Sequence, residues 1–210
     1  ATVPTAAGTS ARASWARSWV CTTRMVTRRS MTPWCAWLSR GPCGTLIGHV
    51  SRANVVWREL DSATPSVVMF QGPQAYITPG WYPSKAKHDK VVPTWNYVVA
   101  HAHGVARAIE DRDWMLDMLN RLTNAHEARR SMPWSVGDAP TSFIDRLMRG
   151  IVGIEIVIER LEGKLKASQD EEIQDRHGTV RGLQEEAGDE PVAMADLVLK
   201  AIEQDGARRP

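Results

Sequence analysis

The sequence of 210 residues has little cysteine and no long apolar run. Three cysteines without a C-x-x-C pair argue against a disulfide framework and against a zinc site. No apolar stretch approaches the roughly 18 residues that span a bilayer. The first 20 residues also lack the continuous apolar core of a signal peptide. We therefore expect a soluble cytoplasmic protein that makes no membrane contact.

Acidic residues are missing from the first part of the chain, where the first one is Glu59. Residues 1–58 carry eight arginines and no lysine, whereas the remaining 18 basic and 24 acidic residues leave the rest of the chain at −6. All three cysteines and four of the nine tryptophans lie within residues 1–43. The segment is either a basic arm that follows nucleic-acid phosphates or a stretch foreign to the fold, such as a frame-altered one. We favour the second interpretation and expect poor order or irregular packing over about residues 1–40.

From residue 44 the composition is that of a folded domain with several short strands. We expect strands at residues 44–50, at Ser66–Phe70 closed by Gln71-Gly72-Pro73, from Val91 to about Ile109, and at Ile151–Leu161. Alternation along the third strand places Asn96 and Trp95 on opposite faces. Because parallel strands need long crossovers, these short connections favour an antiparallel barrel.

Helical spacing predicts helices that flank these strands. Asp111 is a candidate N-cap for a helix that ends near Arg130, and shorter helical patterns cover residues 143–148, 170–187 and 194–203. We therefore predict an α+β protein that is mainly β with flanking helices. Its expected parts are the anomalous segment 1–43, a barrel with inserted helices over 44–170, and a C-terminal helical extension over 171–210.

Motifs for catalysis and for metal binding are absent from the sequence. It contains no G-x-S-x-G, Walker, G-x-G-x-x-G or H-E-x-x-H string. His101 and His103 share one face of a strand, but no further ligand stands at a spacing that completes a metal site. We interpret them as partly buried, hydrogen-bonded histidines, and we predict neither catalytic residues nor metal ligands.

Three local clusters suit an anionic, aromatic ligand. The stretch His49–Asn54 ends a strand and opens a helix, where a hydroxyl, a guanidinium and backbone N–H groups favour phosphate. The loop Trp81–Lys85 combines flat rings with a hydroxyl and an ammonium, and Pro93–Tyr97 adds polar groups beside an aromatic ring. Taken singly, each also fits an ordinary structural role: a capped helix start, a surface loop, or a strand with a core aromatic residue.

These residues resemble the PaiB-type family of FMN-binding negative transcriptional regulators. The matching strings are GTLIGHVSRAN at 44–54, FQGPQAYITPGWYPSK at 70–85, VVPTWNYVVAHAHG at 91–104, IVGIEIVIERLEGKLKASQ at 151–169 and MADLV at 194–198. The resemblance covers essentially all of residues 44–200, and W-Y-P-S-K and V-P-T-W-N-Y are its most specific strings.

The resemblance implies an antiparallel split β-barrel that binds FMN non-covalently at the interface of a homodimer. It implies phosphate contacts from the strand at 44–50 and its following turn, a second positive charge, flavin-side contacts near residue 95, and a K-x-K-x-S-Q string at the end of the last strand. Asp170 departs from the family's usual Asn. The cofactor-binding residues it implies are His49, Ser51, Arg52, Asn54, Lys85, Thr94, Trp95, Asn96, Lys166 and Gln169.

Two functions from different classes follow from this resemblance. The first is an FMN-binding negative regulator of transcription, which acts on DNA or indirectly through a partner. Direct DNA binding has weak support, because the chain after residue 58 is acidic and no helix-turn-helix stands out. The alternative is a flavin-dependent oxidoreductase of the flavin-reductase or pyridoxamine-phosphate-oxidase type, in which FMN supplies the redox chemistry.

Overall fold

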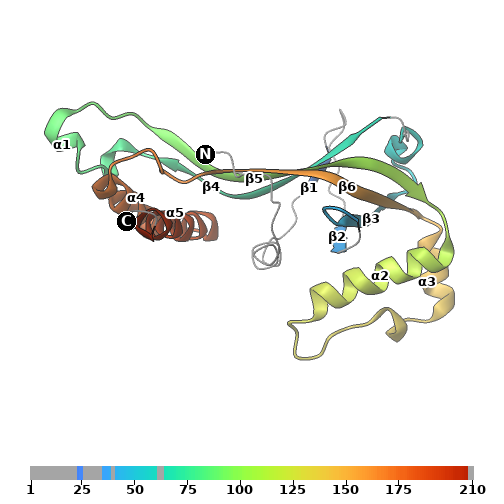
Figure 1. Ribbon diagram of the computed structural model, residues 1–210. Coiled ribbons are helices and arrows are strands. Elements are labelled where there is room, and N and C mark those ends of the chain that lie inside the picture. Colours follow the sequence, from blue (N-terminus) through green and yellow to red (C-terminus); the bar gives the residue numbers. More distant parts are fainter. Residues whose placement is uncertain (1–22, 26–34, 39–40, 61–63, 208–210) are drawn as a thin grey trace. The chain divides into compact units, whose positions relative to one another are not determined.

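The computed structural model describes residues 23–25, 35–38, 41–60 and 64–207 (Figure 1). The described chain divides into two compact units, which are considered separately here. Unit 1 contains Gln71–Ala100 and residues 162–207. Unit 2 contains the described residues up to Phe70 and the segment His101–Leu161.

The described strands form one sheet in the order β1-β4-β5-β6-β3-β2. The pairs β1–β4, β2–β3 and β3–β6 are antiparallel, as the predicted antiparallel sheet requires. In the last pair, Thr45 lies opposite Val157 and Ser51 opposite Ile151. The strands are β1 (Thr23–Met25), β2 (Cys35–Leu38), β3 (Thr45–Ser51), β4 (Ser66–Ile77), β5 (Thr94–Ile109) and β6 (Ile151–Lys166).

Helices flank this sheet, so the predicted class of an α+β fold with an antiparallel sheet is confirmed. The α-helices are α1 (Lys85–His88), α2 (Arg112–Glu127), α3 (Thr141–Met148), α4 (Ile173–Glu185) and α5 (Asp189–Ala207). Short 3₁₀ segments in the described part of the chain are η2 (Val55–Arg58), η3 (Pro79–Trp81) and η4 (Val136–Asp138).

The core of unit 2 lies on both faces of the β3–β6 pair. On one face the even-numbered apolar residues of β6 pack against β3 residues such as Leu46 and Val50. On the other face Ile47 contacts the methionine-rich sides of α2 and α3. The carboxylate of Asp111 accepts a hydrogen bond from the Trp114 N–H at 2.8 Å, so the predicted N-cap of α2 is confirmed.

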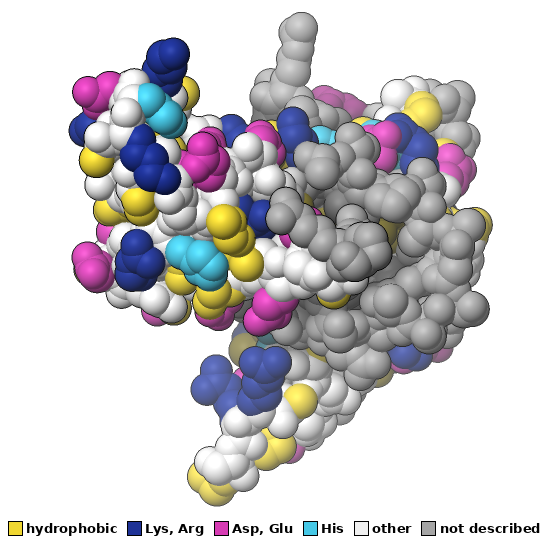
Figure 2. All heavy atoms as spheres, turned by 60° about the vertical axis from the view of Figure 1, so that its left-hand side comes forward, with side chains coloured by type: hydrophobic (Ala, Val, Ile, Leu, Met, Phe, Trp, Pro, Cys, Tyr) yellow, Lys and Arg dark blue, Asp and Glu magenta, His cyan; other side chains and the backbone are white. Residues whose placement is uncertain are grey.

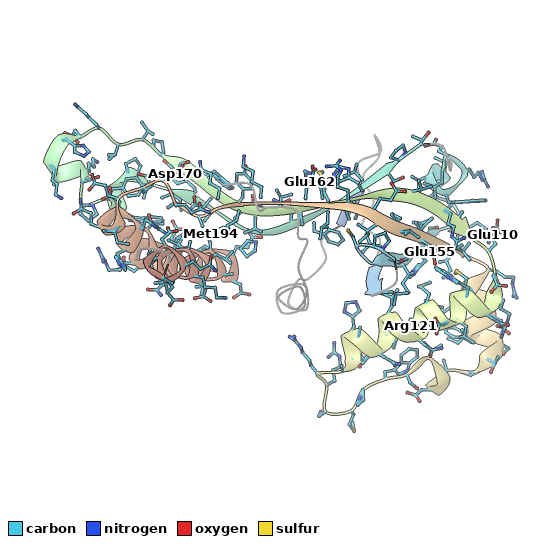
Figure 3. The ribbon with its side chains drawn as sticks, viewed as in Figure 1. Glu110, Arg121, Glu155, Glu162, Asp170 and Met194 are labelled. Carbon is cyan, nitrogen blue, oxygen red and sulfur yellow. The ribbon has the colours of Figure 1, made fainter. Side chains whose placement is uncertain are left out.

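The core of unit 1 forms where α4 and α5 pack side by side against the sheet (Figure 1). Ile77, Leu183 and Met194 are almost fully buried in it, and Figure 3 shows Met194 on the helix pair. On β5, Asn96 and Ala100 are buried, while Trp95 on the opposite face is exposed, as the period of two predicts. The alternation predicted for this strand is therefore confirmed, whereas Trp95 is not the core aromatic residue that was also considered for Pro93–Tyr97.

Strand β4 is longer than the sequence pattern indicated. Gln71-Gly72-Pro73 was expected to close the strand, but β4 continues to Ile77. Among the described strands, β1 pairs with β4 only at Val68–Phe70. Beyond Phe70 that edge therefore has no described partner, and a proline without an N–H is tolerated at such an edge.

Part of the N-terminal segment also differs from expectation. Irregular packing was expected over about residues 1–40, yet Thr23–Met25 and Cys35–Leu38 form strands that pair with β4 and β3. Most of the segment, including Trp34, lies outside the described residues. The domain boundaries at residues 43 and 170 therefore stay predictions.

Candidate functional site

The turn that follows β3 contains three of the predicted phosphate ligands. The Ser51 hydroxyl accepts a hydrogen bond from the Ala53 N–H at 3.3 Å, and the Asn54 side chain accepts one from the Val56 N–H at 3.0 Å. The second contact caps η2. Both side chains therefore stabilise the turn itself, which matches the ordinary structural role weighed for this cluster.

The guanidinium of Arg52 has three protein partners. Its Nη1 donates to the Glu110 carboxylate at 2.8 Å, and Nε and Nη2 donate to the carbonyls of Arg149 and Ile151 at 3.0 and 3.3 Å. Glu110 follows the end of β5 (Figure 3). Arg52 thus ties the end of β3 to the turn before β6, and its charge is balanced by a carboxylate.

Arg58 is a second cation at this turn, and sequence reasoning did not single it out. Its guanidinium carbon lies 4.9 Å from the centre of the Trp57 ring, and that of Arg52 lies 5.7 Å from the same ring. The Trp57 indole N–H donates to the Arg52 carbonyl at 3.1 Å, which fixes the ring. Arg58 is exposed and forms no ion pair with any described residue. Stacking on tryptophan therefore orients a cation whose charge is not neutralised.

His49 lies on β3, just before this turn. Its Nδ1 atom is shielded from solvent and has no hydrogen-bond partner among the described residues. Burial lowers the pKa of the imidazole below its usual value, so the ring is favoured in the neutral form. A buried ring nitrogen without a partner is a position where a ligand group would complete a hydrogen bond.

A second group of predicted residues meets in unit 1, at the corner formed by the start of β5 and the end of β6. The ammonium of Lys166 donates to the Thr94 hydroxyl. The Asn96 amide donates to the Ser168 hydroxyl at 2.9 Å and accepts from the Ser168 N–H at 3.2 Å. Asn96 is fully buried, and Ser168 has a left-handed backbone with φ of 55°. The Asn96 amide thus holds this turn in its uncommon conformation.

Gln169 braces the same corner. Its side-chain oxygen accepts from the Ala167 N–H at 2.7 Å, and its amide nitrogen donates to the Leu165 carbonyl at 3.1 Å. The structure therefore brings Thr94, Asn96, Lys166 and Gln169 together in one corner. Of these four residues, Lys166 is the charged one.

Several carboxylates follow Lys166 in the sequence, and two of them, Asp170 and Asp175, act on Glu171. Burial raises the pKa of Glu171, and the negative charges of Asp175 and Asp170 raise it further, whereas Lys166 lowers it. Figure 3 shows Asp170 between the end of β6 and α4. An anion bound at Lys166 would therefore meet repulsion from these carboxylates, Asp170 included.

Trp95 lies on the face of unit 1 opposite to Asn96. Its ring and that of Tyr76 are each 48% exposed, with centres 6.4 Å apart, and its indole N–H donates to Gln74 at 3.2 Å. Two residues further along β5, the ammonium of Lys164 lies over the Tyr97 ring, 5.7 Å from its centre. These residues form an accessible aromatic surface on which a flat ring can stack.

The W-Y-P-S-K loop does not offer its rings to a ligand in the way the sequence suggested. Tyr82 and Ser84 are buried, and Trp81 is packed against α4. Burial, assisted by the charges of Glu171 and Asp175, raises the pKa of Tyr82 to about 12. Lys85 is exposed and forms no ion pair within the described part of the chain. Only Lys85 in this loop therefore remains an accessible ligand candidate.

The described strands form an antiparallel sheet with flanking helices. Residues 15–160 match the family model described as "Putative FMN-binding domain". This match spans more than half of the chain, so the protein belongs to that family and its cofactor is FMN. The match begins inside the segment 1–43, and the resemblance found in the sequence is confirmed.

Relatives of known sequence support the same membership. The chain is 31% identical over 153 residues to "Protease synthase and sporulation protein PAI 2" of Bacillus subtilis, covering 73% of this chain and 71% of that protein. It is 33% identical over 181 residues to "Uncharacterized protein AN0679" of Emericella nidulans, covering 74% of this chain and 72% of the relative.

Solved structures with a similar fold include two flavoproteins. The flavocytochrome Anf3 from Azotobacter vinelandii is 11% identical with a TM-score of 0.43, over 69% of this chain and 60% of that chain. An FAD- and heme-binding protein from Mycobacterium smegmatis is 16% identical with a TM-score of 0.43, over 63% of this chain and 57% of that chain. The chain therefore spans less than two thirds of the length of these structures.

The chemistry of the described residues fits FMN, which carries a phosphate, a chain of hydroxyls and a flat heteroaromatic ring. In unit 2, neither the Nδ1 atom of His49 nor the Arg58 guanidinium has a hydrogen-bonding or carboxylate partner among the residues that the structure describes. In unit 1, Lys85 and Lys166 supply positive charge, and Trp95 offers an exposed ring face. Each unit, taken by itself, thus contains groups whose chemistry suits a flavin nucleotide.

Proposed function

We propose that this protein is an FMN-binding negative regulator of transcription. The observation that carries the proposal is the 31% identity to a Bacillus subtilis protein whose name links it to protease synthesis and sporulation. Production of proteases and sporulation are processes under transcriptional control, so a relative named for them supports a regulatory role. FMN binding by the family supplies the ligand to which the regulator responds.

Regulation through a partner is better supported than direct contact with an operator. The chain after residue 58 carries −6, and DNA binding requires a basic surface. Figure 2 shows basic side chains mixed with acidic ones on the visible face rather than gathered in one patch. Among the described helices, none is long and apolar enough to cross a membrane. The proposed partners are therefore FMN, a second copy of the chain, and a protein of the transcription machinery.

Two candidate sets of cofactor contacts are proposed, each within a single unit. In unit 2, His49 supplies a ring nitrogen, and Ser51, Arg52 and Asn54 shape the turn for the phosphate. In unit 1, Trp95 supplies an aromatic surface, while Lys85 and Lys166 supply positive charge. The remaining predicted residues of unit 1, Thr94, Asn96 and Gln169, hold the corner that carries Lys166.

Titration with FMN, followed by flavin absorbance and fluorescence, tests the cofactor first. We expect saturable binding at about one flavin per chain, and a protein that ignores FMN would contradict the proposal. The regulatory role is tested in the source organism by deleting the gene and measuring transcript levels. We expect a set of transcripts to rise, and to fall again when the full-length gene is restored.

A turnover assay separates this proposal from the oxidoreductase alternative. The FMN-loaded protein is mixed with reduced nicotinamide and oxygen, and consumption of the nicotinamide is followed. A regulator should show no more turnover than free FMN at the same concentration. Sustained consumption well above that level, together with unchanged transcripts in the deletion strain, would favour the oxidoreductase instead.

A further inference from the structure

Helix α4 lies beyond the family match at residues 15–160. The W-Y-P-S-K loop packs against this helix where two glycines, Gly178 and Gly182, face Trp81. A Cβ atom at Gly182 would lie 2.2 to 2.5 Å from three atoms of the Trp81 ring. A Cβ atom at Gly178 would lie 2.0 Å from the Trp81 carbonyl oxygen. Side-chain atoms do not approach that closely, so only glycine at both positions lets the tryptophan rest on the helix.

Two hydrogen bonds fix the loop one turn nearer the start of α4. The Ser84 N–H donates to one Asp175 carboxylate oxygen at 2.9 Å, and the Ser84 hydroxyl donates to the other at 2.5 Å. Ser84 and Asp175 are each only 2% exposed. A buried carboxylate is costly unless it is hydrogen-bonded, so this pair defines one position of the loop on the helix.

A third contact lies at the exposed rim of the same surface. The Lys87 ammonium donates to the Gln174 side chain at 2.8 Å. Lys85 stands between Ser84 and Lys87, and its N–H donates to the Tyr82 carbonyl at 3.1 Å. The residues on both sides of Lys85 are thus anchored to α4, while its own ammonium is exposed and forms no ion pair with a described residue.

We propose that Asp175 is a positioning residue for FMN: by holding Ser84 it fixes where Lys85 presents its ammonium, and Lys85 receives the phosphate of FMN. The inference rests on the proposed FMN binding described above. A tethered cation loses less conformational freedom when it binds an anion than a cation on a free loop does. The helix after the barrel therefore contributes to cofactor affinity without touching the cofactor.

The test compares FMN with riboflavin, which has the same ring system but no phosphate. We use the ratio of the riboflavin dissociation constant to the FMN dissociation constant, which falls when the phosphate contact is lost. A general loss of fold instead lowers both affinities and leaves this ratio unchanged. Ser84→Ala removes the hydroxyl without changing the charge, and Asp175→Asn removes the carboxylate. We expect each substitution to lower FMN affinity about tenfold, as for the loss of a charge-assisted hydrogen bond, and to leave riboflavin affinity unchanged.

Lys85→Ala should lower the ratio by the same factor. Combined with Ser84→Ala it should cause no further loss, because both substitutions remove the same phosphate contact. Ser84→Thr keeps the hydroxyl and should restore the ratio. Asp205→Asn is the matched control, since Asp205 on α5 pairs with Arg176 of α4 at 2.7 Å and is not involved in holding the loop.

The outcomes separate the inference from the proposed function. If the parent protein binds neither flavin, FMN binding itself fails, and the inference fails with it. If the parent binds FMN but Ser84→Ala leaves the ratio unchanged, the inference alone is overturned. A rise in the ratio for Asp175→Asn with no effect of Ser84→Ala would also overturn it, because Asp175 would then act only through its negative charge.

Discussion

Arg52 and Arg58 have different partners, although the sequence singled out only Arg52 as a phosphate-side candidate. Arg52 bonds to Glu110 and to two carbonyls, whereas Arg58 stacks on Trp57 and is not neutralised by any described carboxylate. We predict that Arg52→Ala lowers the free energy of unfolding by about 1–2 kcal/mol, because two carbonyls and one carboxylate lose a partner at a partly exposed site. Arg58→Ala should leave stability within about 0.5 kcal/mol. If the phosphate lies at the turn after β3 and not at Lys85, Arg58→Ala should lower FMN affinity about tenfold.

Urea unfolding and FMN titration of the two variants check this division. Arg146→Ala is the matched control, because Arg146 also stacks on an aromatic ring, with its guanidinium carbon 5.2 Å from the centre of Phe143. The control should retain FMN affinity. A large loss of FMN affinity in Arg52→Ala, with Arg58→Ala unaffected, would instead return the phosphate contact to Arg52.

His49 gives the stability of the flavin-free protein a pH dependence. Burial lowers its pKa in the folded state, so as the pH falls below 6.5 the unfolded chain takes up a proton that the folded protein does not. Stability contributed by neutral His49 is therefore present above pH 6.5 and is lost as the pH falls toward the lowered pKa. The slope from one group is at most about 1.4 kcal/mol per pH unit.

Urea unfolding from pH 7.5 to 5.0 measures this dependence. His49→Gln should show a shallower loss of stability over that range than the parent protein. His88→Gln serves as the control, because His88 is exposed on α1. Equal slopes for the parent and His49→Gln would show that another group sets the dependence.

Single residues also show what a sequence can and cannot predict about a site. The resemblance implied Asn96 and Gln169 as cofactor contacts, and the structure shows their side chains hydrogen-bonded within the corner at Ser168. Whether an amide faces a ligand or a neighbouring turn depends on the backbone conformation of that turn, which no local pattern reveals. Arg58 was missed because an exposed arginine beside a tryptophan is common in any sequence.

At the scale of elements, local signals were reliable where one interaction decides the structure. The cap at Asp111 and the alternation of β5 both appear as predicted, because a cap and a buried face each act over a few residues. The extension of β4 past Gly72 and Pro73 was not predictable, because it depends on which strand lies at its edge. The packing of Trp81 on Gly182 was likewise hidden, since the two residues are 101 positions apart.

At the scale of the whole molecule, three strands connect the two units. β4, β5 and β6 each contribute residues to both, so neither unit has a sheet made only of its own strands. Unfolding of one unit would leave the other with shortened strands and unpaired backbone groups. We therefore predict a single cooperative unfolding transition, although the contacts divide the chain into two compact parts.

Hydrogen exchange at increasing urea concentration measures this cooperativity in each unit separately. Peptides from α4 and α5 report on unit 1, and peptides from α2 and α3 report on unit 2. The two sets should share one midpoint in the parent protein. Ser84→Ala, which weakens a contact wholly inside unit 1, should lower both midpoints by the same amount. A shift confined to α4 and α5 would show instead that the shared strands do not couple the units, and that each unfolds as an independent domain.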